Sequence, residues 1–322
     1  MKILITGAAG FLGLHLVNSL LEFNHNIFLI DNFMRGMKDN NFDDLISNQN
    51  VHFYNLNLTL DDSLEILDKD FDFIIHFAAI LGVENVVKDN FKVLNENFLM
   101  TKNLLEFANL NKKLKRFIFT STSEVYGGTL NFHGLKFPTP ESTEIILPAL
   151  NFPRTSYMLS KIYGEALCHA SDLPVTIIRP HNIYGPRMGF SHVIPQIMMR
   201  ASKTEINGDL VIYSPSHKRE FCYVKDAIEL ILLLMKIESK DLLTVNLGNV
   251  GEEITMKNLS ELILGIMDRR DINIIDGKNT EGSPERRIPD ISQLNFLTNK
   301  QDRIPLIDGI QKTYLWYKRF ID

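Results

Sequence analysis

Apolar positions in the first half of the chain form short continuous runs separated by longer stretches of mixed character. The runs are rich in β-branched and aromatic residues, and they do not alternate with polar residues. Such continuity is typical of parallel strands that are buried on both faces of a sheet. The pattern predicts strands at 2–6, 26–30, 51–54, 71–77, 116–121 and 175–179.

Between these runs, apolar residues recur at the spacing of amphipathic helices, as in LGLHLVNSLLEF and FLMTKNLLEFANL. Strands that alternate with helices indicate repeated βαβ units. The predicted fold class is therefore α/β, with a Rossmann-type doubly wound parallel sheet and a smaller, interleaved α+β domain.

The pattern changes after about residue 180, where Arg, His, Pro and Gly become more frequent. A helical run VKDAIELILLLMK and a strand-like TVNLG still resemble parts of the first domain. We expect a cofactor domain formed by residues 1–180 and about 222–248. Residues 181–221 and 249–322 are expected to form a substrate domain.

Composition excludes several classes of protein. The 322 residues are 45% apolar and carry a net charge of −5, which favours neither nucleic acid nor an anionic membrane as a partner. No apolar run approaches the roughly 20 residues that span a bilayer. Two cysteines and scattered histidines give no metal spacing. We expect a metal-free, cytoplasmic protein.

A glycine-rich segment, Gly7-Ala8-Ala9-Gly10-Phe11-Leu12-Gly13, follows the first strand and opens the first helix. Glycines permit a tight turn and let backbone N–H groups approach a pyrophosphate at the helix N-terminus. Asp31 ends the second predicted strand, where a carboxylate binds ribose hydroxyls and repels a 2′-phosphate. The combination predicts NAD as cofactor.

Tyr157 and Lys161 are four residues apart in the helical stretch RTSYMLSKIYGEAL, so one face of the helix presents both. A nearby ammonium favours the phenolate, and we expect it to lower the pKa of Tyr157. A phenol tuned in this way can take a proton from a sugar hydroxyl.

Taken in order, TGAAGFLG, HFAA, STSEVYG, YMLSK, RPHNIYGPRMG, REFCYVKD and SPERRIPDIS resemble the extended short-chain dehydrogenase/reductases, in particular their nucleotide-sugar epimerase/dehydratase branch. The resemblance covers nearly the whole chain. It implies that Thr122 hydrogen-bonds the substrate hydroxyl beside Tyr157. It also implies that Ser123 and Glu124 face the sugar carbons next to the oxidised one.

The resemblance extends to the remaining contacts with cofactor and substrate. Besides Gly7, Gly10, Phe11, Leu12, Gly13, Asp31, Tyr157 and Lys161, the expected cofactor residues are Asn32, Asn57, Leu58, Ala78, Ala79 and Pro180. The expected substrate residues are His181, Asn182, His192, Tyr213, Arg219 and Arg287. Asn182, Arg219 and Arg287 resemble phosphate and nucleotide contacts, and Tyr213 a stacking partner of the base.

The implied activity begins with NAD-dependent oxidation of the sugar at C4, and the fate of the 4-keto sugar stays open. An epimerase ranks first, because the second half of the chain is epimerase-like. A UDP-glucuronate decarboxylase ranks next, since STSEVYG is similar to that branch. A 4-dehydrogenase or 4-keto reductase follows, and a dinucleotide-sensing regulator is the non-enzymatic alternative. Ser123 in place of Asp argues against a 4,6-dehydratase.

The resemblance also implies a homodimer. Helix 94–111 and the helix that carries Tyr157 would pair with their copies in a four-helix bundle. Both helices have apolar residues at helical spacing, which packing within one chain explains equally well.

Overall fold

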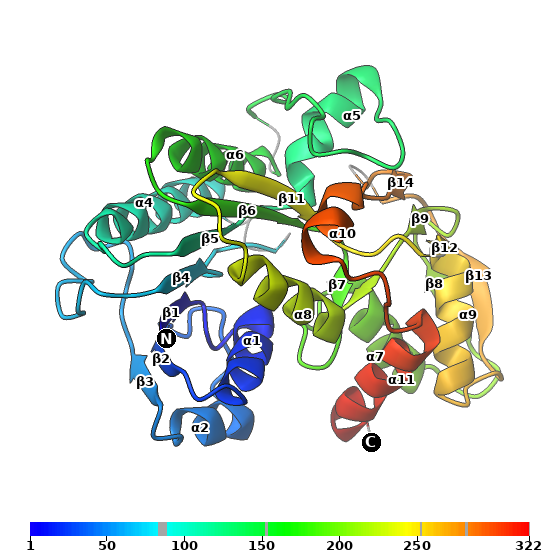
Figure 1. The fold of residues 1–322 in the computed structure, drawn as a ribbon. Helices are drawn as coiled ribbons and strands as arrows, with labels where there is room; N and C mark the ends of the chain where they lie inside the picture. The colour runs from blue at the N-terminus through cyan, green and yellow to red at the C-terminus, as the bar shows by residue number, and fades with distance from the viewer. Residues whose placement is uncertain (83–88, 152–153, 252, 281–282, 322) are drawn as a thin grey trace. The chain divides into compact units, whose positions relative to one another are not determined.

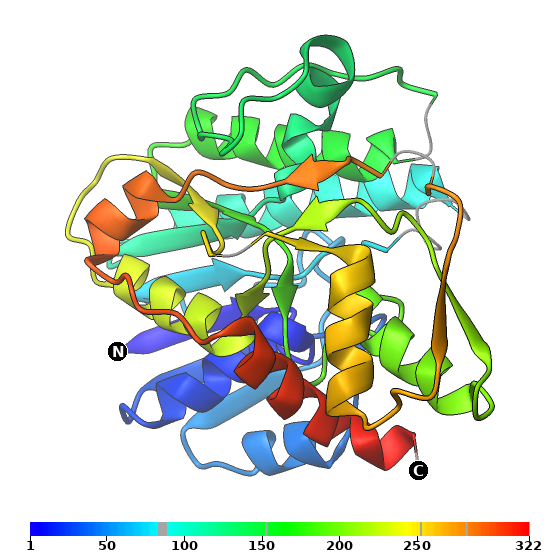
Figure 2. The same cartoon turned by 90° about the vertical axis from the view of Figure 1, so that its right-hand side faces the viewer.

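The computed structural model describes residues 1–82, 89–151, 154–251, 253–280 and 283–321 (Figures 1 and 2). Within them the chain divides into two compact units. The first comprises Met1–Leu135, Glu141–Pro180 and Leu230–Asn246, and the second comprises Lys136–Pro140, His181–Glu229 and Leu247–Asp322. The assignment of cofactor and substrate to separate domains stays a prediction.

The first unit is built on a seven-stranded sheet, counted over the described residues, with the order β11-β6-β5-β4-β1-β2-β3. Neighbouring strands from β6 to β3 pair in parallel. The strands are β1 Lys2–Thr6, β2 Asn26–Ile30, β3 Val51–Tyr54, β4 Phe73–His76, β5 Arg116–Thr120, β6 Val175–Pro180 and β11 Leu243–Leu247. The predicted Rossmann-type sheet is confirmed, with the fourth strand shorter than its apolar run.

Helices cover both faces of this sheet. In Figures 1 and 2, α4 and α6 lie against one face and α1 against the other. The helices of this unit are α1 Phe11–Leu21, α2 Asn40–Ile46, α4 Asn90–Asn109, the 3₁₀ turn η1 Ser123–Tyr126, α5 Gly127–His133 and α6 Thr155–Ala170. Long α4 and α6 pack along each other, and their Phe98 and Tyr163 rings lie 4.7 Å apart.

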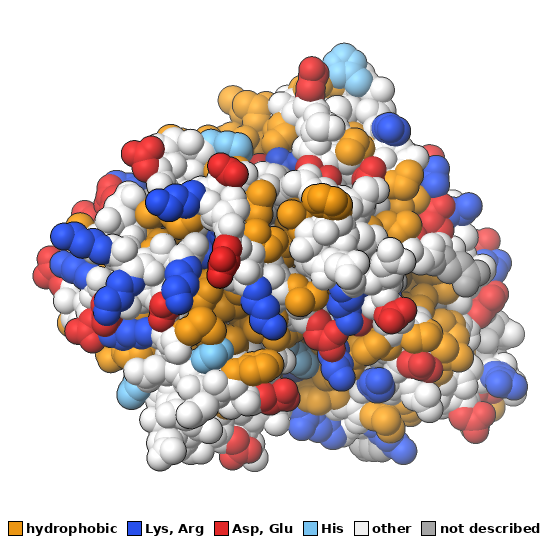
Figure 3. Space-filling model, viewed as in Figure 1, with side chains coloured by type: hydrophobic (Ala, Val, Ile, Leu, Met, Phe, Trp, Pro, Cys, Tyr) orange, Lys and Arg blue, Asp and Glu red, His pale blue; other side chains and the backbone are white. Residues whose placement is uncertain are grey.

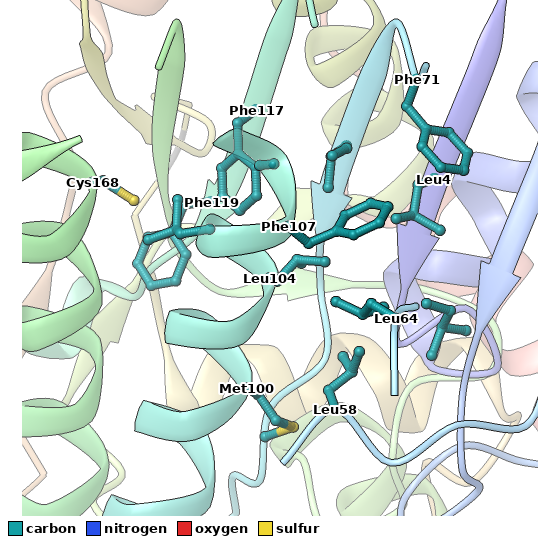
Figure 4. Close-up of a cluster of buried hydrophobic side chains, with 14 of the residues drawn as sticks. Leu4, Leu58, Leu64, Phe71, Met100, Leu104, Phe107, Phe117, Phe119 and Cys168 are labelled. Atoms are coloured by element: carbon teal, nitrogen blue, oxygen red, sulfur yellow. The ribbon is translucent and has the colours of Figure 1, made fainter. Parts of the chain in front are cut away.

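A hydrophobic core fills the space between the sheet and α4 (Figure 4). Phe117 and Phe119 from β5 meet Leu104 and Phe107 from α4, and all four are buried. Phe117 and Phe119 belong to a continuous apolar run, whereas Leu104 and Phe107 are buried positions of an amphipathic helix. Burying both faces of the strands fixes the sheet and thereby the ends of the strands, where functional groups gather.

The second unit combines short strand pairs with a group of three helices. β8 Asp209–Ile212 pairs with β13 Asn273–Asp276, and β9 Lys218–Arg219 lies between β12 Ile254–Thr255 and β14 Arg286–Arg287. β7 Ile183–Tyr184 pairs with β10 Cys222–Tyr223. Helices α7 Val193–Lys203, α9 Met256–Ile266 and α11 Leu306–Tyr317 pack together. The remaining helices are α8 Val224–Met235, α10 Ser292–Thr298 and the 3₁₀ turn η2 Lys318–Phe320.

Charged side chains on the surface are mixed in sign. Along α4, Lys92 pairs with Glu96 at 3.7 Å and Lys102 with Glu106 at 2.9 Å, both at i, i+4 spacing. On the face drawn in Figure 3, basic and acidic side chains are interspersed. Among the described helices, none combines the length and apolarity needed to cross a membrane.

Candidate active site

The glycine turn has the geometry that a dinucleotide diphosphate requires. Gly7 adopts a φ of +70°, and a Cβ there would come within 2.6 Å of the Ala78 nitrogen. At Gly13 a Cβ would lie 2.4 Å from the Gly7 carbonyl oxygen, so α1 can approach the turn this closely only with glycine. The N-cap of α1 is Gly10, which has no side chain to cap the first turn. The helix N-terminus is thus shaped for a phosphate.

Asp31, at the end of β2, is buried and bonded to the same turn. Its Oδ2 accepts a hydrogen bond from the Ala9 N–H at 2.9 Å, and its Oδ1 accepts one from the Phe33 N–H at 2.8 Å. Each carboxylate oxygen can accept a second bond, as ribose hydroxyls would require. The residues at the ends of β1 and β2 therefore fit a dinucleotide.

Other expected cofactor residues lie at the same edge of the sheet, with different local roles. Ala78 and Ala79 follow β4, and the Ala78 N–H donates to Thr6 Oγ1 at 3.3 Å. The Asn57 side chain accepts from Thr59 in a local turn, whereas the Leu58 side chain belongs to the core (Figure 4). Of the others, Phe11 and Leu12 begin α1, Asn32 is exposed after β2, and Pro180 ends β6.

Tyr157 and Lys161 lie one turn apart on α6, as predicted; Lys161 is buried and Tyr157 is partly buried. The Lys161 ammonium donates to the Thr120 carbonyl at 2.8 Å, at the end of β5. Burial lowers the pKa of Lys161 to about 8. Thr122, two residues after Thr120, forms a side-chain hydrogen bond with Tyr157.

The expected lowering of the Tyr157 pKa by Lys161 is wrong for the protein alone. Burial, together with the negative charge of Glu124, raises the pKa of Tyr157. The bond with Thr122 and the charge of Arg35 oppose this rise but do not outweigh it. The tyrosine is therefore a protonated phenol at neutral pH in this state.

Glu124 lies in the η1 turn, in electrostatic reach of Tyr157. Thr122 is the N-cap of this turn, and its Oγ1 accepts a hydrogen bond from the Glu124 N–H at 3.2 Å. The Glu124 carboxylate pairs with Arg154, with Nη2 and Oε1 2.7 Å apart. Ser123 is buried beside it. The structure thus brings together all five residues of the predicted catalytic group.

Two arginines near this group were not found from the sequence. Arg154 is the N-cap of α6, three residues before Tyr157, and this i, i+3 spacing was the available signal. Arg35 follows β2, and its Nη1 donates to the Ala79 carbonyl at 3.4 Å. No spacing in the sequence indicates that Arg35 reaches across to the end of β4.

The second unit holds the residues expected at the nucleotide. Arg287 on β14 is the register partner of Arg219 on β9, so both side chains leave the same face of a parallel pair. The Arg219 guanidinium donates to the Pro284 and Glu285 carbonyls at 2.6 and 3.2 Å. These bonds orient the cation and anchor segment 283–285.

The other four expected substrate residues are spread over the same unit. Asn182 Nδ2 donates to the Glu220 carbonyl at 2.8 Å. Tyr213 is exposed, and the Arg200 guanidinium lies 5.7 Å from the centre of its ring. His181 is buried after β6, whereas His192 is exposed as the N-cap of α7. Their roles toward a substrate stay predictions.

Comparison with known proteins defines the class. The model of the NAD-dependent epimerase/dehydratase family matches residues 3–248, and the chain belongs to this family. It is therefore an enzyme of the nucleotide-sugar epimerase, dehydratase and decarboxylase group, and its cofactor is NAD.

Curated relatives and solved structures extend the match to the whole chain. UDP-N-acetyl-α-D-glucosaminuronate decarboxylase of Bacillus cytotoxicus is 30% identical, with 98% of each chain covered. UDP-glucuronic acid decarboxylase 1 of Danio rerio is 31% identical over 100% of this chain and 73% of its own length. The structure of UDP-glucuronic acid 4-epimerase from Bacillus cereus, in complex with UDP-glucuronic acid and NAD, superposes with a TM-score of 0.81 at 27% identity, covering 99% of this chain and 100% of the other.

Proposed function

We propose that this enzyme decarboxylates a UDP-linked hexuronate. The observation that carries the proposal is the position of Glu124, a carboxylate in electrostatic reach of Tyr157 and held by Arg154. A simple exchange of hydride at C4 needs no such group, whereas chemistry at C5 does. The two curated relatives described above are both decarboxylases. They favour a decarboxylase over the epimerase that the sequence ranked first.

The chain's residues divide the reaction into two stages. Tyr157 must first lose its own proton, which the charge of Arg35 and the hydrogen bond with Thr122 favour. The phenolate then takes the proton from the C4 hydroxyl, and Thr122 orients the two groups. NAD, held by the glycine turn at 7–13 and by Asp31, would supply the acceptor for the C4 hydride and, at the end, the donor that reduces the ketone again.

The resulting ketone labilises the C5 carboxylate, because the electron pair of the breaking bond can move toward the ketone oxygen as carbon dioxide leaves. Glu124 and Ser123 then serve the delivery of a solvent proton to C5. Hydride finally returns to the C4 ketone, and the proton held by Tyr157 returns to its oxygen.

A second candidate is a UDP-hexuronate 4-epimerase. The match to the UDP-glucuronic acid 4-epimerase structure favours it, and so do the epimerase-like motifs of the second half. In that reaction the carboxylate is retained, and hydride returns to the opposite face of C4.

The products distinguish the two candidates. Protein stripped of nucleotide and reloaded with NAD is incubated with UDP-glucuronate, UDP-N-acetylglucosaminuronate and, as the control without a carboxylate, UDP-glucose. Decarboxylation predicts a product lighter by one carbon dioxide from an acidic sugar and no product from UDP-glucose. An isomer of unchanged mass from an acidic sugar would establish the epimerase instead. Turnover of UDP-glucose alone would contradict both.

A further inference from the structure

A buried ion pair joins α6, the helix that carries Tyr157 and Lys161, to strand β6. Arg179, near the end of β6, donates from Nε to Glu165 Oε1 at 2.9 Å and from Nη2 to Glu165 Oε2 at 2.6 Å. The two side chains are 6% and 5% exposed. The pair is bidentate, which fixes the orientation of both groups as well as their separation.

The third nitrogen of Arg179 bonds to other elements of the site. Nη1 donates to the Tyr126 hydroxyl at 2.8 Å and to the Glu141 carbonyl at 3.1 Å. Tyr126 ends the η1 turn that holds Glu124, and its own hydroxyl donates to Asn246 Oδ1 at 2.9 Å. One guanidinium therefore ties α6, η1 and the 141 loop together.

Glu165 extends the same network to β5. Its Oε1 accepts a hydrogen bond from the Ser121 hydroxyl at 2.5 Å, and Ser121 directly precedes Thr122. Glu165 also lies one helical turn after Lys161, which itself lies one turn after Tyr157. Every backbone segment that presents a catalytic side chain is thus bonded to Arg179 or Glu165.

Fold stability alone does not require this arrangement. Taking two charges out of water costs several kcal/mol, and apolar replacements of a buried ion pair are often about as stable. Reaction rate, in contrast, is sensitive to orientation, since a displacement of about 1 Å can cost about a hundredfold.

We propose that the Arg179–Glu165 pair is a positioning device for the reaction, which holds Thr122, Glu124, Tyr157 and Lys161 in one geometry. The inference rests on the proposed C4 oxidation but not on the fate of the ketone, because decarboxylase and epimerase share that step. The negative charge of Glu165 also helps to keep Lys161 protonated against the effect of burial.

Substitution by lysine separates charge from geometry. In Arg179→Lys the cation stays, but a single ammonium cannot bond in a fork to Glu165 and also reach Tyr126. We expect kcat for hydride transfer, followed as NADH absorbance in a single turnover, to fall about 10- to 100-fold. KM and the dissociation constant for NAD should change less than about threefold, since neither residue of the pair is a predicted ligand.

Arg116→Lys is the matched control. Arg116 is also fully buried and also donates to carbonyl groups, those of Ile237 and Asp241 among them. It begins β5, however, at the edge of the sheet opposite the active site. We expect this variant to lower the melting temperature and to leave the rate per folded molecule unchanged.

Glu165→Gln tests the pH dependence of activity, which a purely structural role of the pair would leave unchanged. Without the carboxylate, the pKa of Lys161 should fall further, so the decline of activity at alkaline pH should begin at lower pH than in the native enzyme. If Arg179→Lys loses no more rate than Arg116→Lys and the pH profile of Glu165→Gln is unchanged, the inference is wrong. If none of the nucleotide sugars tested leads the native enzyme to reduce NAD, the proposed function fails instead.

Discussion

Two charged groups, Glu124 and Arg35, and one hydrogen bond, with Thr122, act on the Tyr157 phenol. Glu124 opposes ionisation of the phenol, while Arg35 and the hydrogen bond with Thr122 favour it. Because Glu124 is also paired with Arg154, its carboxylate is held in place beside the phenol. In the reaction we propose, oxidation at C4 and the later step at C5 would therefore depend on different side chains.

The first prediction separates these steps by mutation. Tyr157→Phe should abolish every reaction, because no group remains to take the C4 hydroxyl proton. Thr122→Ala should slow the same step about ten- to a thousandfold, the usual cost of a lost catalytic hydrogen bond. Glu124→Gln keeps the shape of the side chain but not its basicity, so oxidation should survive. NADH and a 4-keto sugar, trapped with borodeuteride, should then accumulate.

The opposite outcome for Glu124 is equally informative. If Glu124→Gln blocks hydride transfer as completely as Tyr157→Phe, the proposed division between C4 and C5 chemistry is wrong. If Glu124→Gln turns over normally, simple epimerisation at C4 is the better assignment.

The second prediction concerns pH. The pKa of Lys161 is lowered by burial to about 8, so its ammonium is present below that pH and is lost as pH rises through it. An amine without charge cannot favour the phenolate of Tyr157. The rate of hydride transfer should therefore fall above about pH 8. In Lys161→Met, the residual rate should lack this alkaline decline; a decline that persists would assign it to another group.

At the scale of elements, the contact of the glycine turn with α1 is the feature most sensitive to small changes. The third prediction is that Gly13→Ala weakens NAD binding, because the new Cβ would lie 2.4 Å from the Gly7 oxygen and 2.7 Å from the Ala8 Cα. Overpacking costs about 1–3 kcal/mol, which corresponds to roughly 5- to 150-fold in the dissociation constant. Titration of NAD into stripped protein measures it.

Gly265→Ala is the control for this helix substitution. Gly265 lies in α9, and a Cβ there would have no neighbour within 4 Å. Alanine should raise the free energy of unfolding by about 0.5–1 kcal/mol, since glycine loses more conformational freedom in a helix. NAD affinity should not change. Equal affinity in the two variants would contradict the role of the turn.

The bounds of helices and strands matched those predicted from the sequence wherever burial in the fold agreed with the local pattern of apolar residues. The continuous run at 26–30 gave a strand with the expected bounds. The run at 71–77 gave a shorter strand, Phe73–His76, although the Asp72 and Phe77 N–H groups still donate to the Lys2 and Thr6 carbonyls at its two ends. Boundaries of this kind depend on neighbours distant in sequence.

At the scale of the whole molecule, the fourth prediction is a homodimer that uses α4 and α6. Tyr163 on α6 is 42% exposed and contacts Phe98 on α4, so the two helices present an aromatic surface beside their mutual contact. Tyr163→Glu should place a charge in that interface and give a monomer in light scattering. Phe296→Glu, at an 86% exposed position on α10, should leave the dimer intact. A native monomer would refute the prediction.

The sequence by itself determined the sheet, the glycine turn, NAD and the placement of Tyr157 and Lys161 one turn apart on a single helix. Each is encoded locally, by hydrophobic period, by residues that only a tight turn needs, or by spacing along one helix. Only the tertiary structure decided that Glu124 meets Arg154, that Arg35 reaches the end of β4, and that Arg179 joins α6 to η1. It also reversed the expected direction of the Tyr157 pKa, because burial and the charge of Glu124 raise this pKa more than Thr122 and Arg35 lower it. Desolvation and contacts between distant segments arise only when the chain is packed, so no local sequence pattern predicts them.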